Sequence, residues 1–365
     1  MNHCAYTRRS SGGFGRSELL LLIGSICFTL LIAEGIARWQ NLAPTIYQIQ
    51  PGREKTSYKI SDNPILGYEL KNNYRDIRPD HWESFERINQ HGLRDVDREI
   101  AKPPGTQRVI LLGDSVVLGI ALTDISYTIS RQLELMYSSG VEVLNFGLAG
   151  YNTLQEAELL RVKGIQFSPD VVVVLFTEND FHDKSGNIWA YSFNRPPGIN
   201  ALFTSSDLFR WLALKFDWFH FRSELDPNYQ QEWNYQAIGE NNVLAGLRLL
   251  AKLRRENGFK LLLAAWPQFT DTGPNYPDYL MDQAEPQKLK IEALAEKFDI
   301  PVVRLDAAIQ QEVEAMKSED PALTSGGTKT TFTTDGMHPN NNGTKAAARA
   351  LKKVLAEKEL VAADS

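Results

Sequence analysis

The residues best suited to chemistry are a serine and a distant aspartate–histidine pair. Ser115 ends the string Gly-Asp-Ser after a short apolar run, and His338 stands three residues after Asp335. A serine at a strand-to-helix turn exposes its hydroxyl and its backbone N–H, which suits a nucleophile that generates an oxyanion. A carboxylate three residues before a histidine can fix the imidazole tautomer while the other ring nitrogen faces the serine. Each piece also has an ordinary structural interpretation, as a helix N-cap or a helix-start acidic residue.

Two other turns offer hydrogen-bond donors of the kind an oxyanion needs. Gly150 lies in a glycine-rich string, residues 145–153, where backbone N–H groups can approach a ligand closely. Asn179 follows a β-branched run, and its side-chain amide can donate a hydrogen bond. The backbone N–H of Ser115 and the amide of Asn179 are therefore candidate donors to an oxyanion.

The remaining polar residues favour no other chemistry. The histidines outside the 335–338 turn, among them His91 and His182, lack metal-ligand spacing with a carboxylate. The sequence has no Walker A string, no Cys-x-x-Cys pair and no Gly-x-Gly-x-x-Gly after a strand, so we expect no metal and no cofactor. Asp114 adjoins the serine and cannot easily reach the far nitrogen of a histidine, so we expect it to brace its own loop.

The turns that carry these residues follow apolar runs that we predict to be strands. The runs are continuous rather than alternating, which is typical of strands buried on both faces. The five runs are residues 108–112, 141–146, 170–177, 259–266 and 301–305. Helical patterns occupy residues 126–138, 152–164, 240–257, 285–298 and 341–357. This alternation predicts an α/β fold with a parallel sheet covered by helices on both faces, with ligands at the carboxyl ends of the strands.

Composition excludes several classes of protein. The chain has 365 residues, of which 43% are hydrophobic and 10% aromatic, so it is neither disordered nor collagen-like. Two cysteines are too few for a disulfide scaffold, and a net charge of −6 argues against a nucleic-acid partner. A mean hydropathy of −0.31 excludes a polytopic membrane protein but leaves room for a single span.

One such span is expected near the N-terminus. Residues 19–33 carry no charge, and the apolar character resumes toward Trp39, which makes a helix long enough to cross a bilayer. Three basic residues precede it, namely Arg8, Arg9 and Arg16. The positive-inside rule therefore keeps the N-terminus cytoplasmic and places everything after residue 40 outside.

We prefer to interpret residues 18–39 as a retained signal anchor. A cleaved signal peptide is the main alternative, because the string Ala-Glu-Gly at residues 33–35 offers small residues at the right spacing. A buried core helix is the least favoured interpretation, given the basic flank and the terminal position. Cleavage would make the protein secreted rather than anchored.

The organisation follows from these patterns. The predicted parts are a cytoplasmic N-terminus (1–17), the anchor (18–39), a juxtamembrane linker and lead-in (40–105), an α/β domain (106–358) and a C-terminal tail (359–365). An aromatic-rich insertion, residues 181–239, interrupts the α/β domain. It has three interpretations: a helical segment with its own small core, a lid or substrate platform, and an amphipathic face lying on a membrane.

In this order and at successive strand ends, these strings resemble those of the SGNH (GDSL-like) hydrolase superfamily over about residues 107–357. The resemblance implies a three-layer flavodoxin-like fold and the hydrolysis of esters or thioesters, with acyl transfer in some members. It also implies the roles of the site residues, which are Ser115 as nucleophile, Asp335 and His338 as its partners, and Ser115, Gly150 and Asn179 as the oxyanion hole. The lead-in at residues 89–95 is similar to that of bacterial membrane-anchored members.

Two departures from the family pattern stand next to the site. Val116 and Val117 follow the serine where many relatives carry an aromatic or polar residue, and Thr177 begins the third motif where glycine is common. Neither change removes a reacting group. We therefore expect them to affect substrate fit more than catalytic competence.

The expected function is a membrane-anchored serine esterase on the extracytoplasmic (periplasmic) side of the inner membrane. It would hydrolyse small acyl esters such as acetyl esters, with carbohydrate-linked esters among the candidates, through an acyl-enzyme on Ser115. Two alternatives from other classes stay open: an O-acyltransferase that modifies envelope polysaccharide, and a non-catalytic module that binds glycans or partner proteins. Acyl chain length, the alcohol, protein partners and oligomeric state are left undetermined.

Overall fold

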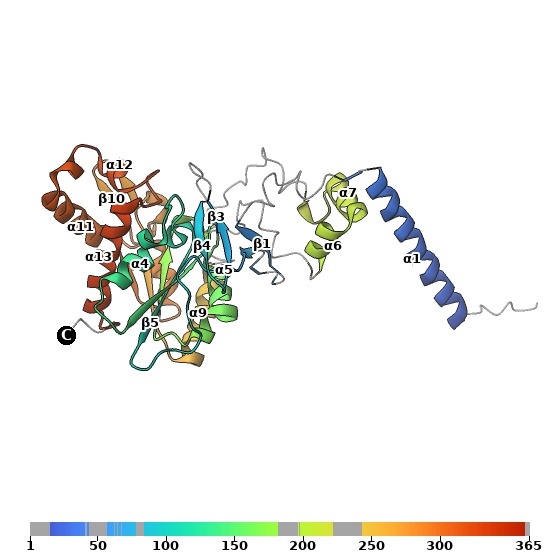
Figure 1. The fold of residues 1–365 in the computed structure, drawn as a ribbon, viewed down its shortest axis with the longest axis horizontal. Helices are drawn as coiled ribbons and strands as arrows, with labels where there is room; N and C mark the ends of the chain where they lie inside the picture. The colour runs from blue at the N-terminus through green and yellow to red at the C-terminus, as the bar shows by residue number, and fades with distance from the viewer. Residues whose placement is uncertain are drawn as a thin grey trace, which may run out of the picture. The chain divides into compact units, whose positions relative to one another are not determined.

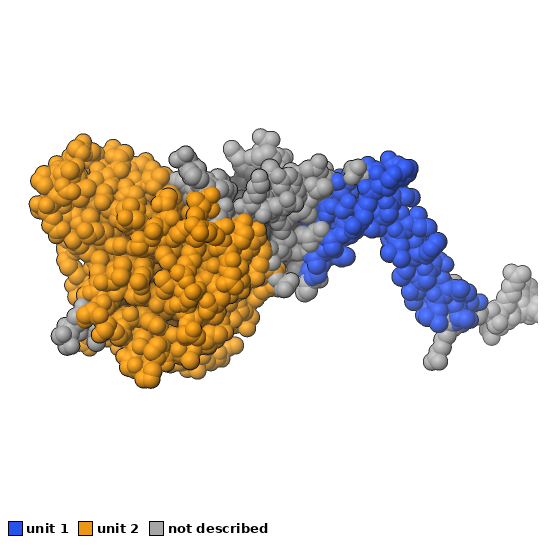
Figure 2. All heavy atoms as spheres, in the orientation of Figure 1, with its two compact units in different colours: residues 1–51, 195–229 blue, residues 52–194, 230–365 orange. Residues whose placement is uncertain are grey.

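The structure is a computed structural model. It has two compact units, which are blue and orange in Figure 2. One unit, residues 1–51 with 195–229, is called the span unit below, and the other, residues 52–194 with 230–365, the sheet unit. The residues that the structure describes are 15–40, 42–43, 57–61, 63, 65–66, 68–77, 84–181, 196, 198–221 and 243–361.

The sheet unit is built on five parallel strands in the order β11-β8-β7-β5-β6. Their bounds are β5 Gln107–Gly113, β6 Val141–Gly147, β7 Val171–Phe176, β8 Lys260–Ala265 and β11 Val302–Arg304. In chain order this is the flavodoxin-like arrangement 2-1-3-4-5, in which the connections reverse direction between the first and third strands. The predicted parallel sheet is confirmed, and each strand ends within two residues of its predicted run.

Alternating side chains of the strands build a hydrophobic core on each face of the sheet. Ile110 and Leu112 of β5 point into one core, and Val109 and Leu111 into the other, all fully buried. The first core is covered by α5 (Thr153–Leu159), α9 (Val243–Asn257) and α10 (Lys290–Glu296). The second is covered by α4 (Ile129–Leu135), α11 (Asp306–Glu319) and α13 (Asn341–Glu357). Figure 1 shows α5 and α9 on one side of β5 and α4 and α13 on the other, which confirms the three-layer α/β fold.

Shorter elements complete the sheet unit. They are α3 Ser115–Leu118, α12 Thr328–Phe332, β9 Gln268–Thr270, β10 Gly273–Asn275, a π-helical turn Leu160–Gly164, and the 3₁₀ turns Ile125–Tyr127, Ile165–Phe167, Glu178–Phe181, Asp278–Leu280 and Pro321–Thr324. Helix α11 is not among the predicted helices, although Ile309, Val313 and Met316 follow helical spacing and are buried.

The lead-in contains two hairpins that the sequence patterns do not predict. They pair β1 (Tyr58–Ile60) with β2 (Tyr68–Leu70) and β3 (Tyr74–Asp76) with β4 (Phe85–Ile88), all antiparallel. Each strand has only three or four residues, too few for a clear alternation of polar and apolar positions. The hairpins nevertheless contribute buried side chains to the first core, so the lead-in is part of the folded sheet unit rather than a linker alone.

Buried Arg94 links the lead-in to the turn that follows the nucleophile. Its guanidinium donates hydrogen bonds to the carbonyl oxygens of Leu118 (3.3 Å), Gly119 and Leu122 (2.6 Å). It also pairs with Glu86 at 3.2 Å, which balances its buried charge. The carbonyl groups at the end of α3 therefore depend on a side chain that lies more than twenty residues earlier in the chain.

The span unit contains α1 (Arg16–Trp39), α6 (Ile199–Ser205), α7 (Asp207–Phe216) and a 3₁₀ turn at Trp218–His220. Within the described part of the chain, α1 is the one helix long and apolar enough to cross a membrane, over Ser17–Trp39 with a mean hydropathy of 2.3. A signal sequence meets the same criteria. The basic residues Arg8 and Arg9 lie outside the described residues.

The predicted insertion is only partly described. Residues 198–221 fold as α6, α7 and the 3₁₀ turn, and they group with α1 rather than with the sheet. The predicted limits of the insertion, residues 181–239, stay a prediction. Several aromatic residues on which the interpretation of the insertion depends, namely Trp189, Tyr191, Phe193, Trp233 and Tyr235, lie outside the described residues.

Helix α3 packs directly against the end of β6, which generates a prediction. A Cβ atom on Gly147 would lie 2.1 Å from the backbone nitrogen of Leu118, so only glycine fits without displacing α3. We expect Gly147→Ala to lower the free energy of unfolding by about 3 kcal/mol, or Tm by about 6–12 °C. Circular dichroism of the full-length protein in detergent measures this change.

Gly326→Ala is the matched control, because a Cβ there meets only flexible threonine hydroxyls at 3.2 Å and 3.3 Å. Its Tm should stay close to that of the wild type. Equal Tm values for the two variants would show that α3 can move away from β6 without cost.

Candidate active site

The sheet brings three of the predicted turns to one edge. Ser115 follows β5, Gly150 follows β6 and Asn179 follows β7, and these three strands are neighbours in the sheet. Gly113 at the end of β5 pairs with Gly147 on one side and with Leu175 on the other. The connections reverse direction between β5 and β7, the place where sheets of this topology bind ligands.

Ser115, His338 and Asp335 form a continuous chain of hydrogen bonds. The Oγ of Ser115 lies 2.8 Å from Nε2 of His338, and Nδ1 of His338 lies 2.7 Å from Oδ2 of Asp335. A carboxylate on Nδ1 favours the tautomer with its proton there, which leaves Nε2 to accept the serine proton. Ser115 as a whole residue is 8% exposed.

Asp335 is held in its ionised form. Burial raises the pKa of this carboxyl, but hydrogen bonds from the backbone and ring of His338 and from the backbone of Met337 outweigh that effect and leave the pKa below its usual value. The same contacts fix the rotamer of the carboxylate. It therefore keeps a negative charge beside the imidazole at neutral pH.

The loop that carries Asp335 and His338 is held in place by Trp266, which follows β8, and by Phe269 of β9. The indole N–H of Trp266 donates to the carbonyl oxygen of Met337 at 3.0 Å, and the backbone N–H of Phe269 donates to that of Gly336 at 2.6 Å. Gly336 has a φ of +104°, which glycine adopts without strain. The sequence patterns do not identify Trp266 as a positioning residue, although a tryptophan at the end of a buried strand needs a partner for its N–H.

Asp114 braces its own loop, as the sequence predicts. Its Oδ1 accepts a hydrogen bond from the backbone N–H of Val116 at 2.9 Å, and its Oδ2 accepts one from the hydroxyl of Thr177, also at 2.9 Å. A further hydrogen bond comes from the side-chain amide of Asn179. Asp114 therefore connects the turn after β5 to the turn after β7.

The candidate oxyanion donors lie at the same edge of the sheet. Gly150 has a φ of +76° in a turn whose Leu148 N–H donates to the carbonyl oxygen of Gly113 at 3.1 Å, which holds the turn against the end of β5. The side-chain amide of Asn179, which interacts with Asp114, carries two N–H donors. The role of both residues as oxyanion donors stays a prediction.

The expectation about Val116 and Val117 is wrong. Both side chains are fully buried in the second hydrophobic core, so they pack beneath the nucleophile turn and do not face a substrate. Thr177 is also buried, and its hydroxyl bonds Asp114. These departures from the family pattern therefore act on packing and on the hydrogen bonds behind the serine.

Behind the nucleophile lies a group of buried acids, Asp114, Glu156 and Asp180. Asp180 accepts hydrogen bonds from the hydroxyl of Thr153 (3.0 Å) and from the backbone of Thr177 (2.7 Å). Both carboxyl oxygens of Glu156 are buried without a hydrogen-bond partner among the described residues. Burial, followed by the negative charges of Asp180 and Asp114, raises the pKa of Glu156 well above its ordinary value of 4.5. The folded environment therefore favours the protonated form of Glu156 more than water does.

No metal is assigned to this site. Among the residues that the structure describes, no group of three or more histidine, cysteine, aspartate or glutamate side chains is arranged to hold a metal ion. The side chains of His81, His182, Asp183 and His220 lie outside the described residues.

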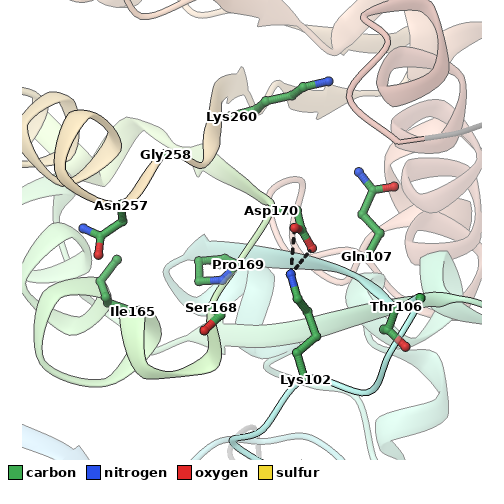
Figure 3. A pocket seen from close by; sticks show the side chains of 11 residues that line it. Lys102, Thr106, Gln107, Ile165, Ser168, Pro169, Asp170, Asn257, Gly258 and Lys260 are labelled. Carbon is green, nitrogen blue, oxygen red and sulfur yellow. Dashed lines mark hydrogen bonds and ion pairs between the residues drawn. The ribbon is translucent and has the colours of Figure 1, made fainter.

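A cavity of about 650 Å³ lies at the opposite edge of the sheet (Figure 3). It is lined by residues at the amino ends of the strands, such as Gln107 of β5 and Lys260 of β8. Lys102 and Asp170 form an ion pair in it at 2.7 Å, which Figure 3 shows as dashed lines. Because Ser115 and Asn179 follow the carboxyl ends of the strands, this cavity is separate from the candidate site.

No protein-family model and no curated protein matches the chain. Among similar solved structures, a protein from Parabacteroides merdae described as a GDSL-like lipase is 15% identical with a TM-score of 0.38, over 68% of this chain and 94% of its own. A carbohydrate acetylesterase family member from Sinorhizobium meliloti is 15% identical with a TM-score of 0.36, over 70% and 99%. A two-domain esterase active on acetylated mannans is 14% identical with a TM-score of 0.40, over 71% and 51%.

The structural neighbours are thus GDSL-like lipases and esterases. Identities and TM-scores this low do not assign an activity to the present chain. The activity is therefore inferred below from the geometry of its own site.

The buried acid group generates a prediction about pH. Between pH 4.5 and the raised pKa of Glu156, the folded protein retains a proton that the unfolded chain releases. Stability then falls as pH rises, by about 1.4 kcal/mol for each pH unit of that interval. The glutamine of Glu156→Gln does not ionise, so this pH-dependent loss of stability is absent. The variant should be more stable than the wild type at pH 7 and similar to it below pH 4.5. Thermal unfolding from pH 4 to pH 9 measures the difference.

Glu158 on the same helix is the matched control with the opposite sign. Burial raises the pKa of Glu158, but hydrogen bonds from Arg161 and Asn63 outweigh this and leave the pKa lowered. Its stabilising contribution is present at neutral pH and is lost as pH falls below 4.5, so Glu158→Gln should reduce stability at pH 7. Identical pH slopes for the wild type and Glu156→Gln would contradict the raised pKa of Glu156.

Proposed function

We propose that this chain is a serine ester hydrolase with Ser115 as the nucleophile. The observation that carries the proposal is the relay from Ser115 through His338 to Asp335, with distances of 2.8 Å and 2.7 Å. Ser115 precedes Asp335 and His338 by more than two hundred residues, and the three side chains meet at the carboxyl edge of the sheet. A serine whose hydroxyl touches an oriented imidazole is the arrangement used for acyl transfer through a covalent intermediate.

The mechanism follows from the atoms in contact. Nε2 of His338 takes the hydroxyl proton as the Oγ of Ser115 bonds to the acyl carbonyl carbon, and Asp335 stabilises the imidazolium that forms. The oxyanion is held by the backbone N–H groups of Ser115 and Gly150 and by the amide of Asn179. The imidazolium then protonates the departing alcohol oxygen, which leaves an acyl-enzyme. Water attacks this ester with His338 again as base, and the carboxylic acid leaves Ser115 free.

Short acyl esters, acetyl esters first among them, are the proposed substrates. The limited exposure of Ser115 supports this choice, because a small acyl group needs less rearrangement than a long one to reach a residue that is only 8% exposed. Carbohydrate-linked acetyl groups belong to this class. The alcohol part of the substrate is left open by the described residues.

We further propose that α1 is retained as a signal anchor and that the sheet unit lies on the extracytoplasmic side. Hydrogen bonds between Glu34 of α1 and the first turn of α7 support retention, because cleavage after Gly35 would remove Glu34 from the folded span unit. Arg8 and Arg9 before α1, and Arg16 at its first position, support a cytoplasmic N-terminus. This arrangement would expose the enzyme to substrates of the cell envelope.

Replacement of the nucleophile tests the activity. Ser115→Ala should reduce the hydrolysis of p-nitrophenyl acetate by about 10⁶-fold and abolish labelling by a fluorophosphonate probe, because no other group can form the acyl-enzyme. A series of p-nitrophenyl esters of increasing chain length measures acyl preference in the same assay. Ser318→Ala, which changes an exposed serine on α11, is the matched control and should retain full activity. Equal turnover by Ser115→Ala and the control would end the assignment.

Replacement of Asn179 tests the oxyanion hole. Asn179→Ala should reduce kcat by about 10²–10³-fold and leave KM nearly unchanged, because its hydrogen bond forms only as charge develops on the carbonyl oxygen. Steady-state kinetics with p-nitrophenyl acetate separate the two parameters. Asn257→Ala is a control on the opposite edge of the sheet, beside the cavity of Figure 3, and should leave both unchanged. A rise in KM with unchanged kcat would assign Asn179 to ground-state binding instead.

A further inference from the structure

Helix α7 is tied to the carboxyl-terminal end of α1. The carboxylate of Glu34 accepts hydrogen bonds from the backbone N–H groups of Asp207 and Leu208, each at 3.0 Å, and so caps the first turn of α7 from a distant part of the chain. Arg38, one turn further along α1, donates to the carbonyl oxygen of Ser205 at 2.7 Å. Figure 1 shows α7 beside this end of α1. The start of α7 is therefore fixed where the apolar span ends.

The chain leaves α7 in a tight turn that exposes aromatic side chains. Residues 216–219, called the aromatic turn below, include Asp217 and Phe219 with φ of 53° and 55°. Phe216, Trp218 and Phe219 are 57%, 41% and 39% exposed, and the rings of Phe216 and Trp218 stack at 6.0 Å. Large exposed aromatic groups gathered in one turn mark a surface that contacts a partner or a membrane.

The neighbouring groups favour a lipid surface as that partner. Lys215 lies over the rings of Trp211 (4.7 Å) and Phe216 (5.7 Å), so a cation accompanies the aromatic side chains. Aromatic rings with an adjacent basic residue are typical of segments at the headgroup level of a bilayer. Trp39 at the end of α1 is 79% exposed, which matches the same environment.

The length of α7 limits how far the aromatic turn can lie from this level. Helix α7 has ten residues, so it is about 15 Å long at 1.5 Å per residue. Its first turn is bonded to Glu34 at the end of the span, and the aromatic turn follows its last residue. The aromatic turn thus lies within one short helix of the point where α1 leaves the bilayer. If α1 spans the bilayer, lipid surrounds the end of α1, and another protein bound to the aromatic turn would have to displace it.

We propose that the aromatic turn inserts into the headgroup region of the leaflet from which α1 emerges, and forms a second membrane contact. This proposal rests on the retention of α1 and is independent of the ester hydrolase chemistry. The span unit would then be held by a helix across the bilayer and by a turn within its outer interface, joined by Glu34 and Arg38. Two contacts restrict rotation of the unit more than a single helix does.

Site-specific fluorescence in full-length protein tests the proposal. Cys4 and Cys27 are first replaced by serine, and Trp218→Cys is then labelled with an environment-sensitive fluorophore and reconstituted in nanodiscs of phosphatidylcholine and phosphatidylglycerol. Emission is measured with lipids brominated near the headgroup and, separately, with aqueous iodide. The label on residue 218 should be quenched by the brominated lipid and shielded from iodide. A label on Ser318→Cys, in the sheet unit, is the matched control and should be quenched by iodide.

A second label at Phe216→Cys guards against local misfolding at residue 218 and should give the same pattern. Iodide quenching at both positions as strong as at residue 318, without quenching by the brominated lipid, would overturn the proposal. Intact mass of the protein shows whether α1 is still present, and loss of residues 1–35 would overturn both the anchor and the second contact. Turnover of p-nitrophenyl acetate by the labelled protein reports the proposed activity separately.

Discussion

The position of β5 between β6 and β7 is the constraint on which the candidate site depends. Parallel strands end at the same edge, so this strand order brings the turns after residues 113, 147 and 176 together. The contact of α3 with Gly147 sets how close those turns can approach, because a single added carbon would meet the backbone of α3. The position of the Ser115 hydroxyl is thereby fixed. The loop that carries Asp335 and His338 then has to place the imidazole within hydrogen-bond distance of it.

The loop that carries the imidazole is held by residues far away in the chain. Asp335 and His338 lie on a loop with little regular structure, and the loop is held by Trp266 and Phe269, which follow β8. On the other side of the nucleophile, the guanidinium of Arg94 binds the carbonyl groups at the end of α3. The reacting groups are thus oriented by side chains from different elements. Preorganisation of this kind is what allows donors and bases to act without reorganisation during the reaction.

The structure carries two costs near the site. Glu156 is buried beside Asp180 and Asp114 without a hydrogen-bond partner among the described residues, and its raised pKa gives a cost in stability that grows with pH. Arg94 is fully buried and depends on Glu86 and on three carbonyl groups for compensation. Unfavourable burial close to a nucleophile is common in enzymes, where position of the reacting groups takes precedence over stability. In the span unit, the exposed aromatic rings are also unfavourable, because they place apolar surface in water. Contact with lipid would remove this cost.

Local patterns in the sequence were enough to predict the strands of the sheet, helix α13 and the candidate residues Ser115, Asp335 and His338. Continuous apolar runs identify buried strands, and Asp-x-x-His on a turn identifies an oriented imidazole within four residues. The same reasoning did not identify Arg94, Trp266 or the bond from Glu34 to α7. Each of these acts on groups far away in the chain, with separations of 24, 71 and 173 residues. It also could not assign Val116 and Val117 to the core. Burial and long-range hydrogen bonds depend on which elements pack together, so these roles became visible only in the folded protein.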